Sequence, residues 1–203
     1  MKGKTVLVIG LLVLVGVLAV FVAVRISAAN YQYQGSLIDP PAPAYDIALQ
    51  DTAGDHFQLS DQTGKVVLLF FGYTNCPDVC PTTMAEFKQI YEKLGPDADR
   101  VQFVYFSVDP ERDTQARVDE FVNAFNPRFI GITGDEADLE PVWQAYGVTH
   151  EKQDVGSAGG YVVNHTAAVY VIDTNGEWRM TFPYGLGVDA MTQDIQHLLA
   201  EES

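Results

Sequence analysis

The chain has 203 residues, of which 27 are acidic and 12 are basic, so its formal net charge is −15 at pH 7. An acidic chain repels phosphate backbones, which argues against nucleic acid as a partner. Its length accommodates one domain of ordinary size and an appendage.

The first predicted element is a membrane helix. Residues 5–24 carry no charge, and as a helix they would be about 30 Å long, which matches the hydrocarbon thickness of a bilayer. A cleaved signal peptide is the alternative, because residues 27–29 are small, but apolar cores of signal peptides usually have about 7 to 15 residues. We therefore expect an uncleaved anchor over residues 1–25. Lys2 and Lys4 place its amino terminus in the cytoplasm and the body of the chain outside, on the periplasmic or outer face.

The segment after the anchor is expected to be a linker. Residues 26–44 are polar, small and proline-bearing, so they would hold a domain over residues 45–203 away from the membrane. Without Lys2, Lys4 and Arg25 the chain has 9 basic and 27 acidic residues, a net charge of −18. Cationic proteins or metal ions are compatible with this charge, and a solvated acidic surface is its simpler interpretation.

The remaining chain alternates between apolar runs and helical patterns, after a hairpin around residues 52–55. Strands alternating with helices indicate an α/β fold with a mainly parallel central sheet covered on both faces and a final antiparallel hairpin. The least determined segment, residues 154–165, is interpreted as a loop or short hairpin. The expected strands are 65–71, 101–108, 128–133, 167–173 and 178–183, and the expected helices are 81–94, 113–125, 135–146 and one from about 188.

The chain has two cysteines, Cys76 and Cys80, which lie where strand 65–71 meets helix 81–94. Ligands usually bind at this edge of an open α/β sheet, and a helix amino end stabilises thiolates. Three interpretations are open: a structural disulfide, a redox pair in which Cys76 attacks and Cys80 resolves, and two soft metal ligands. The spacing is one residue wider than the C-x-x-C of most thioredoxin-like oxidoreductases.

A third ligand would favour the metal interpretation. Two thiolates and an imidazole suit copper, either Cu(I) or Cu(II). His165 lies at the mouth of strand 167–173, where thioredoxin-like proteins commonly place a proline against their cysteines. We interpret His56, His150 and His197 as ordinary polar surface residues.

Three segments together resemble the Sco/SenC family, whose members are membrane-anchored thioredoxin-like proteins that act in copper delivery to cytochrome c oxidase. The resemblance covers about residues 45–200. It implies a thioredoxin-like fold and implies that Cys76, Cys80 and His165 are the copper ligands. The segments are LLFFGYTNCPDVCPTTM, SVDPERDT and YVVNHTAAVYVID.

The resemblance also implies a function. The chain would be a copper chaperone whose partner is the copper-receiving subunit of cytochrome c oxidase, with other copper chaperones or thiol reductants as further partners. The alternative is an extracytoplasmic thiol–disulfide oxidoreductase in which Cys76 and Cys80 reduce the cysteines of an oxidase subunit.

Five further polar residues lie near these motifs. Family members often have aspartate before the histidine, where this chain has Asn164, so a negative charge near the metal is lost. Asp78 and Asp109 are either turn residues or neighbours of the metal. Asp113 or Thr114 is expected to cap the following helix.

Overall fold

The structure is a computed structural model that describes residues 9–16, 18, 31–156 and 160–201. The chain is divided into two units, Met1–Tyr33 and Gln34–Ser203. In the first unit, residues 9–16 and 18 are helical and exposed. The rest of the predicted anchor lies outside the described residues. No described helix combines the length and apolar character that crossing a membrane requires.

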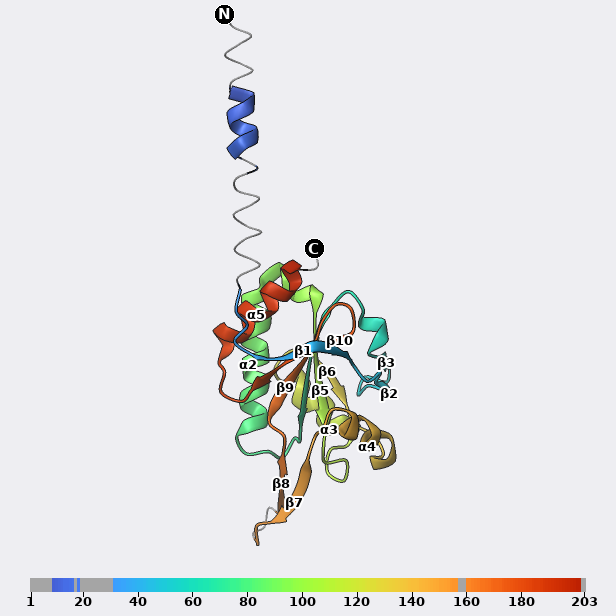
Figure 1. Cartoon of the computed structure of the whole chain (residues 1–203). Coiled ribbons are helices and arrows are strands. Elements are labelled where there is room, and N and C mark those ends of the chain that lie inside the picture. The colour runs from blue at the N-terminus through green and yellow to red at the C-terminus, as the bar shows by residue number, and fades with distance from the viewer. Residues whose placement is uncertain (1–8, 17, 19–30, 157–159, 202–203) are drawn as a thin grey trace, which may run out of the picture. The chain divides into compact units, whose positions relative to one another are not determined.

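The second unit is built on a six-stranded mixed sheet in the order β1–β10–β9–β4–β5–β6 (Figure 1). The strands β4, β5 and β6 are parallel, whereas β9, β10 and β1 each pair antiparallel. All seven residues of β4 are buried, as expected for a central strand. The strands are β1 (Ser36–Pro43), β4 (Val66–Gly72), β5 (Val101–Ser107), β6 (Ile130–Ile132), β9 (Ala168–Ile172) and β10 (Glu177–Pro183).

The sheet differs from the mainly parallel one that the sequence predicts, because three of its pairings are antiparallel. The reason lies in how the chain enters β9. His165, three residues before the start of β9, lies beside Cys80 at the carboxyl edge of β4. A strand that starts at that edge must run opposite to β4, whereas a parallel neighbour would need a crossover back to the other edge.

Helices cover both faces of the sheet. Side chains alternate along a strand, so Phe70 meets Phe87 of α2 on one face, and Phe71 meets Tyr146 at the end of α4 on the other. The α5 helix lies beside α2, and α3 lies beside β6 (Figure 1). The helices are α2 (Val79–Leu94), α3 (Gln115–Asn123), α4 (Glu136–Ala145) and α5 (Val188–Glu201), with 3-10 turns η1 (Ser60–Gln62) and η2 (Gly95–Arg100).

Residues 36–43 form the edge strand β1, although the sequence predicts a linker over residues 26–44. The strand pairs with β10, with an irregular register near its middle. Pro40 and Pro41 are compatible with this position, because an edge strand needs backbone donors on one side only. A proline-bearing polar edge strand therefore has the same sequence character as a linker.

A buried carboxylate ties the start of this unit to α5. Asp194 is fully buried, and its Oδ2 accepts hydrogen bonds from the backbone N–H groups of Gln34 at 2.9 Å and Gly35 at 2.8 Å. We expect Asp194→Ala to lower the free energy of unfolding by about 3 kcal/mol, because it leaves these donors without their charged acceptor. Chemical denaturation measures the change.

Asp189→Ala is the matched control for this prediction. Asp189 lies in the same helix, its side chain is 80% exposed, and it pairs with Lys93 at the surface. Exposed pairs contribute about 0 to 1 kcal/mol. Equal destabilisation by the two substitutions would contradict the proposed importance of Asp194.

Two small hairpins complete the unit. The strands β2 (Ala48–Gln50) and β3 (His56–Gln58) confirm the hairpin predicted around residues 52–55. The segment 154–165 contributes the strand β8 (Tyr161–His165), which pairs with β7 (His150–Asp154) in the second hairpin. Figure 1 shows this hairpin extending from the end of the unit where α2 begins.

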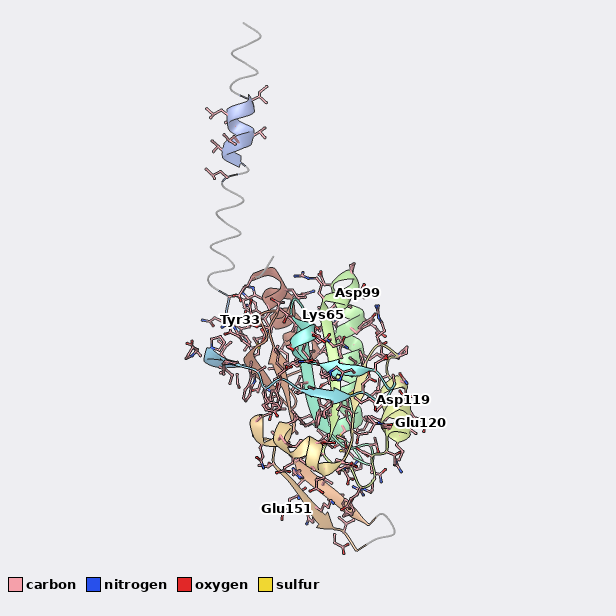
Figure 2. All side chains as sticks on the ribbon, turned by 90° about the vertical axis from the view of Figure 1, so that its right-hand side faces the viewer. Tyr33, Lys65, Asp99, Asp119, Glu120 and Glu151 are labelled. Atoms are coloured by element: carbon pink, nitrogen blue, oxygen red, sulfur yellow. The ribbon has the colours of Figure 1, made fainter. Side chains whose placement is uncertain are left out.

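Acidic side chains are distributed over the outside of this unit. Figure 2 shows Asp99 towards one end of the unit, near the basic residue Lys65. It shows Asp119 and Glu120 on α3, and Glu151 on the β7–β8 hairpin. Asp99, Glu120 and Glu151 are exposed. This distribution is that of a solvated acidic surface.

Candidate metal centre

Both cysteines are free thiols at the carboxyl end of β4. Cys76 is half-buried in the loop, where its N–H donates to the carbonyl of Tyr73 at 3.1 Å. Cys80 is fully buried in the first turn of α2. Its backbone N–H donates to Cys76 Sγ at 3.4 Å, so the amino end of the helix faces the sulfur of Cys76.

Gly72 makes room for the second sulfur. A Cβ atom at this position would lie 3.0 Å from Cys80 Sγ and 3.1 Å from the ring of Tyr105. Neither neighbour can withdraw easily, because Cys80 and Tyr105 are both fully buried. The last residue of β4 is therefore glycine where the strand passes closest to the thiols.

The histidine at the end of β8 approaches the same point. His165 Nε2 lies 3.6 Å from Cys80 Sγ, and Nδ1 lies 3.1 Å from the carbonyl oxygen of Thr166. A carbonyl only accepts, so Nδ1 donates to it, and Nε2 is the ring nitrogen that faces the sulfur. The rings of Phe70 and Tyr73 stand edge-on to the imidazole at centroid distances of 6.2 and 5.8 Å, which limits its rotation.

One potential ligand atom from each of Cys76, Cys80 and His165 lies within 4.8 Å of the others. No other three histidine, cysteine or acidic residues converge in this way within the part of the chain that the structure describes. A cavity of about 300 Å³ opens beside the group and is lined in part by Pro77 and Val162. Two sulfurs and one imidazole nitrogen at this separation can hold a single soft metal ion.

The two thiols differ in acidity. The thiol of Cys80 donates to the sulfur of Cys76 and lowers the pKa of Cys76 to about 3, against the effect of burial and with help from His165 and nearby backbone N–H groups. The same hydrogen bond, together with burial, raises the pKa of Cys80. The half-exposed sulfur is therefore the thiolate, and the buried one keeps its proton until a metal or an electrophile replaces it.

The other three histidines do not join this group. His56 is exposed. His197 is half-buried on α5, where its Nε2 lies 3.3 Å from the carboxylate of Glu201. His150 is half-buried against the indole of Trp143, with ring centroids 4.3 Å apart, so it packs more closely than the predicted surface residue.

The acidic and amide residues near the motifs are also placed by the structure. Asp78 is exposed at the N-cap of α2 and makes no side-chain cap bond. Asn164 is exposed and donates to Gln153 at 3.1 Å, across the hairpin. Thr114 caps α3 by accepting a hydrogen bond from the N–H of Arg117, which confirms one of the two predicted caps.

Asp109 and Asp113 are both buried, and neither is only a turn or cap residue. Asp109 contacts Arg112 and Tyr161, whereas Asp113 accepts hydrogen bonds near the cysteine loop. Burial raises the pKa of Asp113, although its hydrogen bonds oppose this. Sequence reasoning did not identify Arg112 or Tyr161, because neither belongs to a pattern that indicates metal chemistry.

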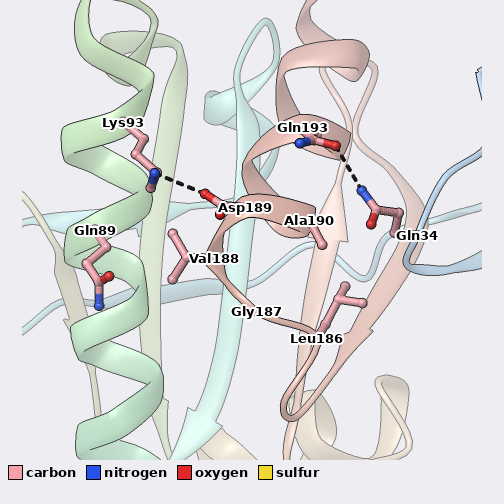
Figure 3. Close-up of a pocket in the computed structure, with 9 residues that line it drawn as sticks. All are labelled: Gln34, Gln89, Lys93, Leu186, Gly187, Val188, Asp189, Ala190 and Gln193. Atoms are coloured by element: carbon pink, nitrogen blue, oxygen red, sulfur yellow. Dashed lines mark hydrogen bonds and ion pairs between the residues drawn. The ribbon is translucent and has the colours of Figure 1, made fainter.

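A second cavity, of about 550 Å³, lies between α2 and the start of α5 (Figure 3). It contains the ion pair of Lys93 with Asp189 at 3.0 Å and the hydrogen bond from Gln34 to Gln193 at 3.2 Å. The nine lining residues include no cysteine or histidine. Of these two cavities, only the first is therefore lined by soft metal ligands among the described residues.

Comparisons with known proteins agree with this geometry. The SCO1/SenC family matches residues 41–200 of the chain. An SCO2-like protein of Rickettsia conorii is 30% identical over 201 residues, which cover 98% of this chain and 96% of that protein. A mitochondrial SCO2 homologue of Bos taurus is 31% identical over 76% of this chain and 59% of its own length.

Solved structures show the same fold. The apo Sco1 protein of Thermus thermophilus superposes with a TM-score of 0.75 at 38% identity, covering 84% of this chain and 99% of that one. The ScoI protein of Bradyrhizobium japonicum, solved with copper bound, gives a TM-score of 0.71 at 34% identity, covering 78% of this chain and 100% of that one. The chain has the Sco-type thioredoxin-like α/β fold, and it belongs to the SCO1/SenC family.

Proposed function

We propose that this chain binds one copper ion through Cys76 Sγ, Cys80 Sγ and His165 Nε2 and delivers it to the copper centre of cytochrome c oxidase. The observation that carries the proposal is the convergence of these three ligand atoms within 4.8 Å. Membership of the SCO1/SenC family supports it, as does the copper bound to the similar ScoI protein.

The ligand set suits copper for two physical reasons. Thiolates are soft ligands that select Cu(I), and an imidazole completes a set that also accepts Cu(II). Cys76 is already a thiolate, because its pKa is lowered to about 3. Binding therefore has to displace only the proton of Cys80. The hydrogen bond to Cys76, together with burial, raises the pKa of Cys80, so copper uptake releases one proton near neutral pH.

Delivery requires that another protein can reach the ion. Cys76 is half-exposed, and the cavity beside it opens between Pro77 and Val162. A ligand of the receiving oxidase subunit can thus enter from this side and replace Cys76 first, while Cys80 and His165 still hold the copper. Transfer by successive ligand exchange changes no oxidation state.

Metal stoichiometry on the purified full-length chain in detergent tests this function. After reduction and loading with Cu(I) under anaerobic conditions, we expect one copper per chain by atomic absorption. After oxidation to a Cys76–Cys80 disulfide, we expect none, because both sulfurs are then consumed. The double variant Cys76→Ser/Cys80→Ser is the control. Equal copper contents in the reduced, oxidised and double-variant proteins would overturn the proposal.

We further propose that residues 1–25 anchor the chain in a membrane, with the amino terminus in the cytoplasm and the domain outside. The uncharged run of residues 5–24 supports an anchor, as do the helical conformation and exposed apolar side chains of residues 9–16. The segment up to β1 would then set the distance between the copper site and the membrane-bound oxidase subunit.

A second candidate function is supported by the difference between the two thiols. Cys76, half-exposed and of lowered pKa, suits attack on a disulfide of an oxidase subunit. The attack forms a mixed disulfide and releases one target thiolate. Cys80 then attacks Cys76 Sγ, releases the second target thiol and leaves the Cys76–Cys80 disulfide, so two electrons pass to the target. The same chain could prepare an acceptor in this way before metallating it.

A further inference from the structure

We propose that the loop of residues 107–113, here called the brace, sets the position of His165 relative to the two cysteines, with Arg112 as its central positioning residue. The brace begins at Ser107, the last residue of β5, and reaches both the cysteine loop and the hairpin that carries His165. This inference rests on the proposed function, because the brace would determine how tightly the site holds copper.

The first arm of the brace holds the cysteine loop. The buried carboxylate of Asp113 accepts from the N–H of Thr74 at 3.1 Å and from its hydroxyl at 2.6 Å. It also accepts from the hydroxyl of Ser107 at 2.7 Å. Thr74 lies two residues before Cys76, so these charge-assisted bonds fix the loop to the end of β5.

The second arm holds the histidine hairpin. The buried Asp109 accepts hydrogen bonds from Arg112 Nε and, at 2.7 Å, from the hydroxyl of Tyr161. Arg112 Nη1 donates to the carbonyl of Tyr161 at 2.8 Å. Its guanidinium carbon lies 3.6 Å from the centroid of the Tyr161 ring, so the backbone, hydroxyl and ring of the first residue of β8 are all held.

Arg112 joins the two arms. Its guanidinium carbon also lies 5.6 Å from the centroid of the Tyr73 ring, and that ring stands edge-on to His165. One planar group therefore contacts the start of the cysteine loop and the start of the strand that ends in His165.

The hairpin needs such a contact, because it is a separate two-stranded sheet without a backbone ladder to the main sheet. At the base of the hairpin, the backbone N–H of Thr149 donates to the hydroxyl oxygen of Thr166 at 3.1 Å. Lys152 pairs with Glu111 at 2.7 Å near the surface. Because Glu111 is itself a brace residue, both strands of the hairpin are tied to the brace, and the brace also reaches the cysteine loop through Asp113 and Thr74.

Stability alone is a poor explanation for this arrangement. A buried ion pair gives little net stabilisation compared with apolar packing. Arg112 Nη2 is buried without a hydrogen-bond partner among the described residues, which is an additional cost. The same residues are well suited to fixing geometry, because a guanidinium that is stacked and bonded on several sides has one allowed position.

Arg112→Lys tests the brace without removing its charge. Lysine can still pair with Asp109, but it lacks the planar fork that reaches the carbonyl and ring of Tyr161. We expect the affinity for Cu(I) to fall about tenfold, within the range found when groups that orient metal ligands are lost. Competition with a chromophoric Cu(I) chelator, on the full-length chain, measures this affinity.

Arg128→Lys is the matched control. Arg128 is exposed and pairs with Asp99 at 2.8 Å, and Figure 2 shows Asp99 at the end of the domain away from Glu151 of the hairpin. We expect its Cu(I) affinity to stay within about twofold of the parent, because it reaches no group that orients a ligand.

A double-variant comparison separates positioning from a general loss of stability. If Arg112 acts through His165, Arg112→Lys has no further effect in a His165→Ala background. If the two losses multiply, or if Arg112→Lys leaves the parent affinity unchanged while His165→Ala lowers it, the brace is refuted and the copper site stands.

A measurement on the metal-free chain covers the remaining case. In the parent we expect nuclear Overhauser cross-peaks between the rings of His165 and Tyr73, and we expect Arg112→Lys, unlike Arg128→Lys, to weaken them. If the parent binds no copper, the proposed function fails, and these cross-peaks alone decide the brace. Unchanged cross-peaks in Arg112→Lys would overturn it.

Discussion

Replacing His165 by alanine is expected to weaken Cu(I) binding by at least about a hundredfold, because loss of a group that merely orients a ligand already costs about 10- to 100-fold. Nε2 faces Cys80 Sγ at 3.6 Å, since Nδ1–H donates to the carbonyl of Thr166. Without it, the copper would keep two sulfur ligands. Competition with a chromophoric chelator measures the loss.

The fold should survive this substitution, because His165 is half-buried at the end of a strand. Far-ultraviolet circular dichroism and the thermal midpoint check this. His56→Ala is the matched control, since His56 is exposed and outside the converging group. Full copper affinity in His165→Ala would remove the histidine from the site and leave a two-sulfur centre. Disulfide reduction, by contrast, should be largely unchanged in this variant.

The acidity of Cys76 leads to the second large effect. At pH 5 we expect Cys76 to react with iodoacetamide almost as fast as at pH 7. Its pKa is lowered to about 3, so the thiolate is fully formed above about pH 4 and is lost only below that. An ordinary cysteine, with a pKa of about 8.5, would lose about a hundredfold in thiolate between pH 7 and pH 5.

Mass spectrometry of the alkylated chain between pH 3 and pH 8 measures this profile, and the buried Cys80 should remain unmodified. Cys80→Ala is the informative variant, because the thiol of Cys80 is the first cause of the lowered pKa. We expect the inflection of the profile to move to higher pH in that variant. An inflection near pH 8.5 in the parent would show that Cys76 is an ordinary thiol and would weaken both candidate functions.

Much of the fold could be predicted from local patterns. The uninterrupted apolar run of β4 required a strand buried on both faces, and β4 is indeed central. The turn at residues 52–55 and the helix that starts beside Cys80 were predicted for similarly local reasons. Burial on one face or on both leaves a period in the sequence, so such elements need no knowledge of the tertiary structure.

Other elements could not be predicted in this way. The edge strand β1 has the composition of a linker, because its pairing with β10 involves backbone groups and leaves most of its side chains exposed. The mixed sheet follows from where β9 enters, beside the cysteines. Both features depend on partners more than a hundred residues away or across the sheet, about which local periodicity carries no information.

The candidate site likewise has features that local patterns predict and features that depend on distant parts of the chain. The spacing pattern placed the two thiols at the start of a helix, and a family resemblance singled out His165 among four histidines. The three-dimensional packing was needed to show that Nε2 of His165 faces Cys80 and that Arg112 contacts Tyr161, 49 positions further along the chain. Residue types and their spacing in the sequence indicate which side chains are available as metal ligands. Their separation and orientation come from the packing of distant elements, and those distances decide whether a metal can be held.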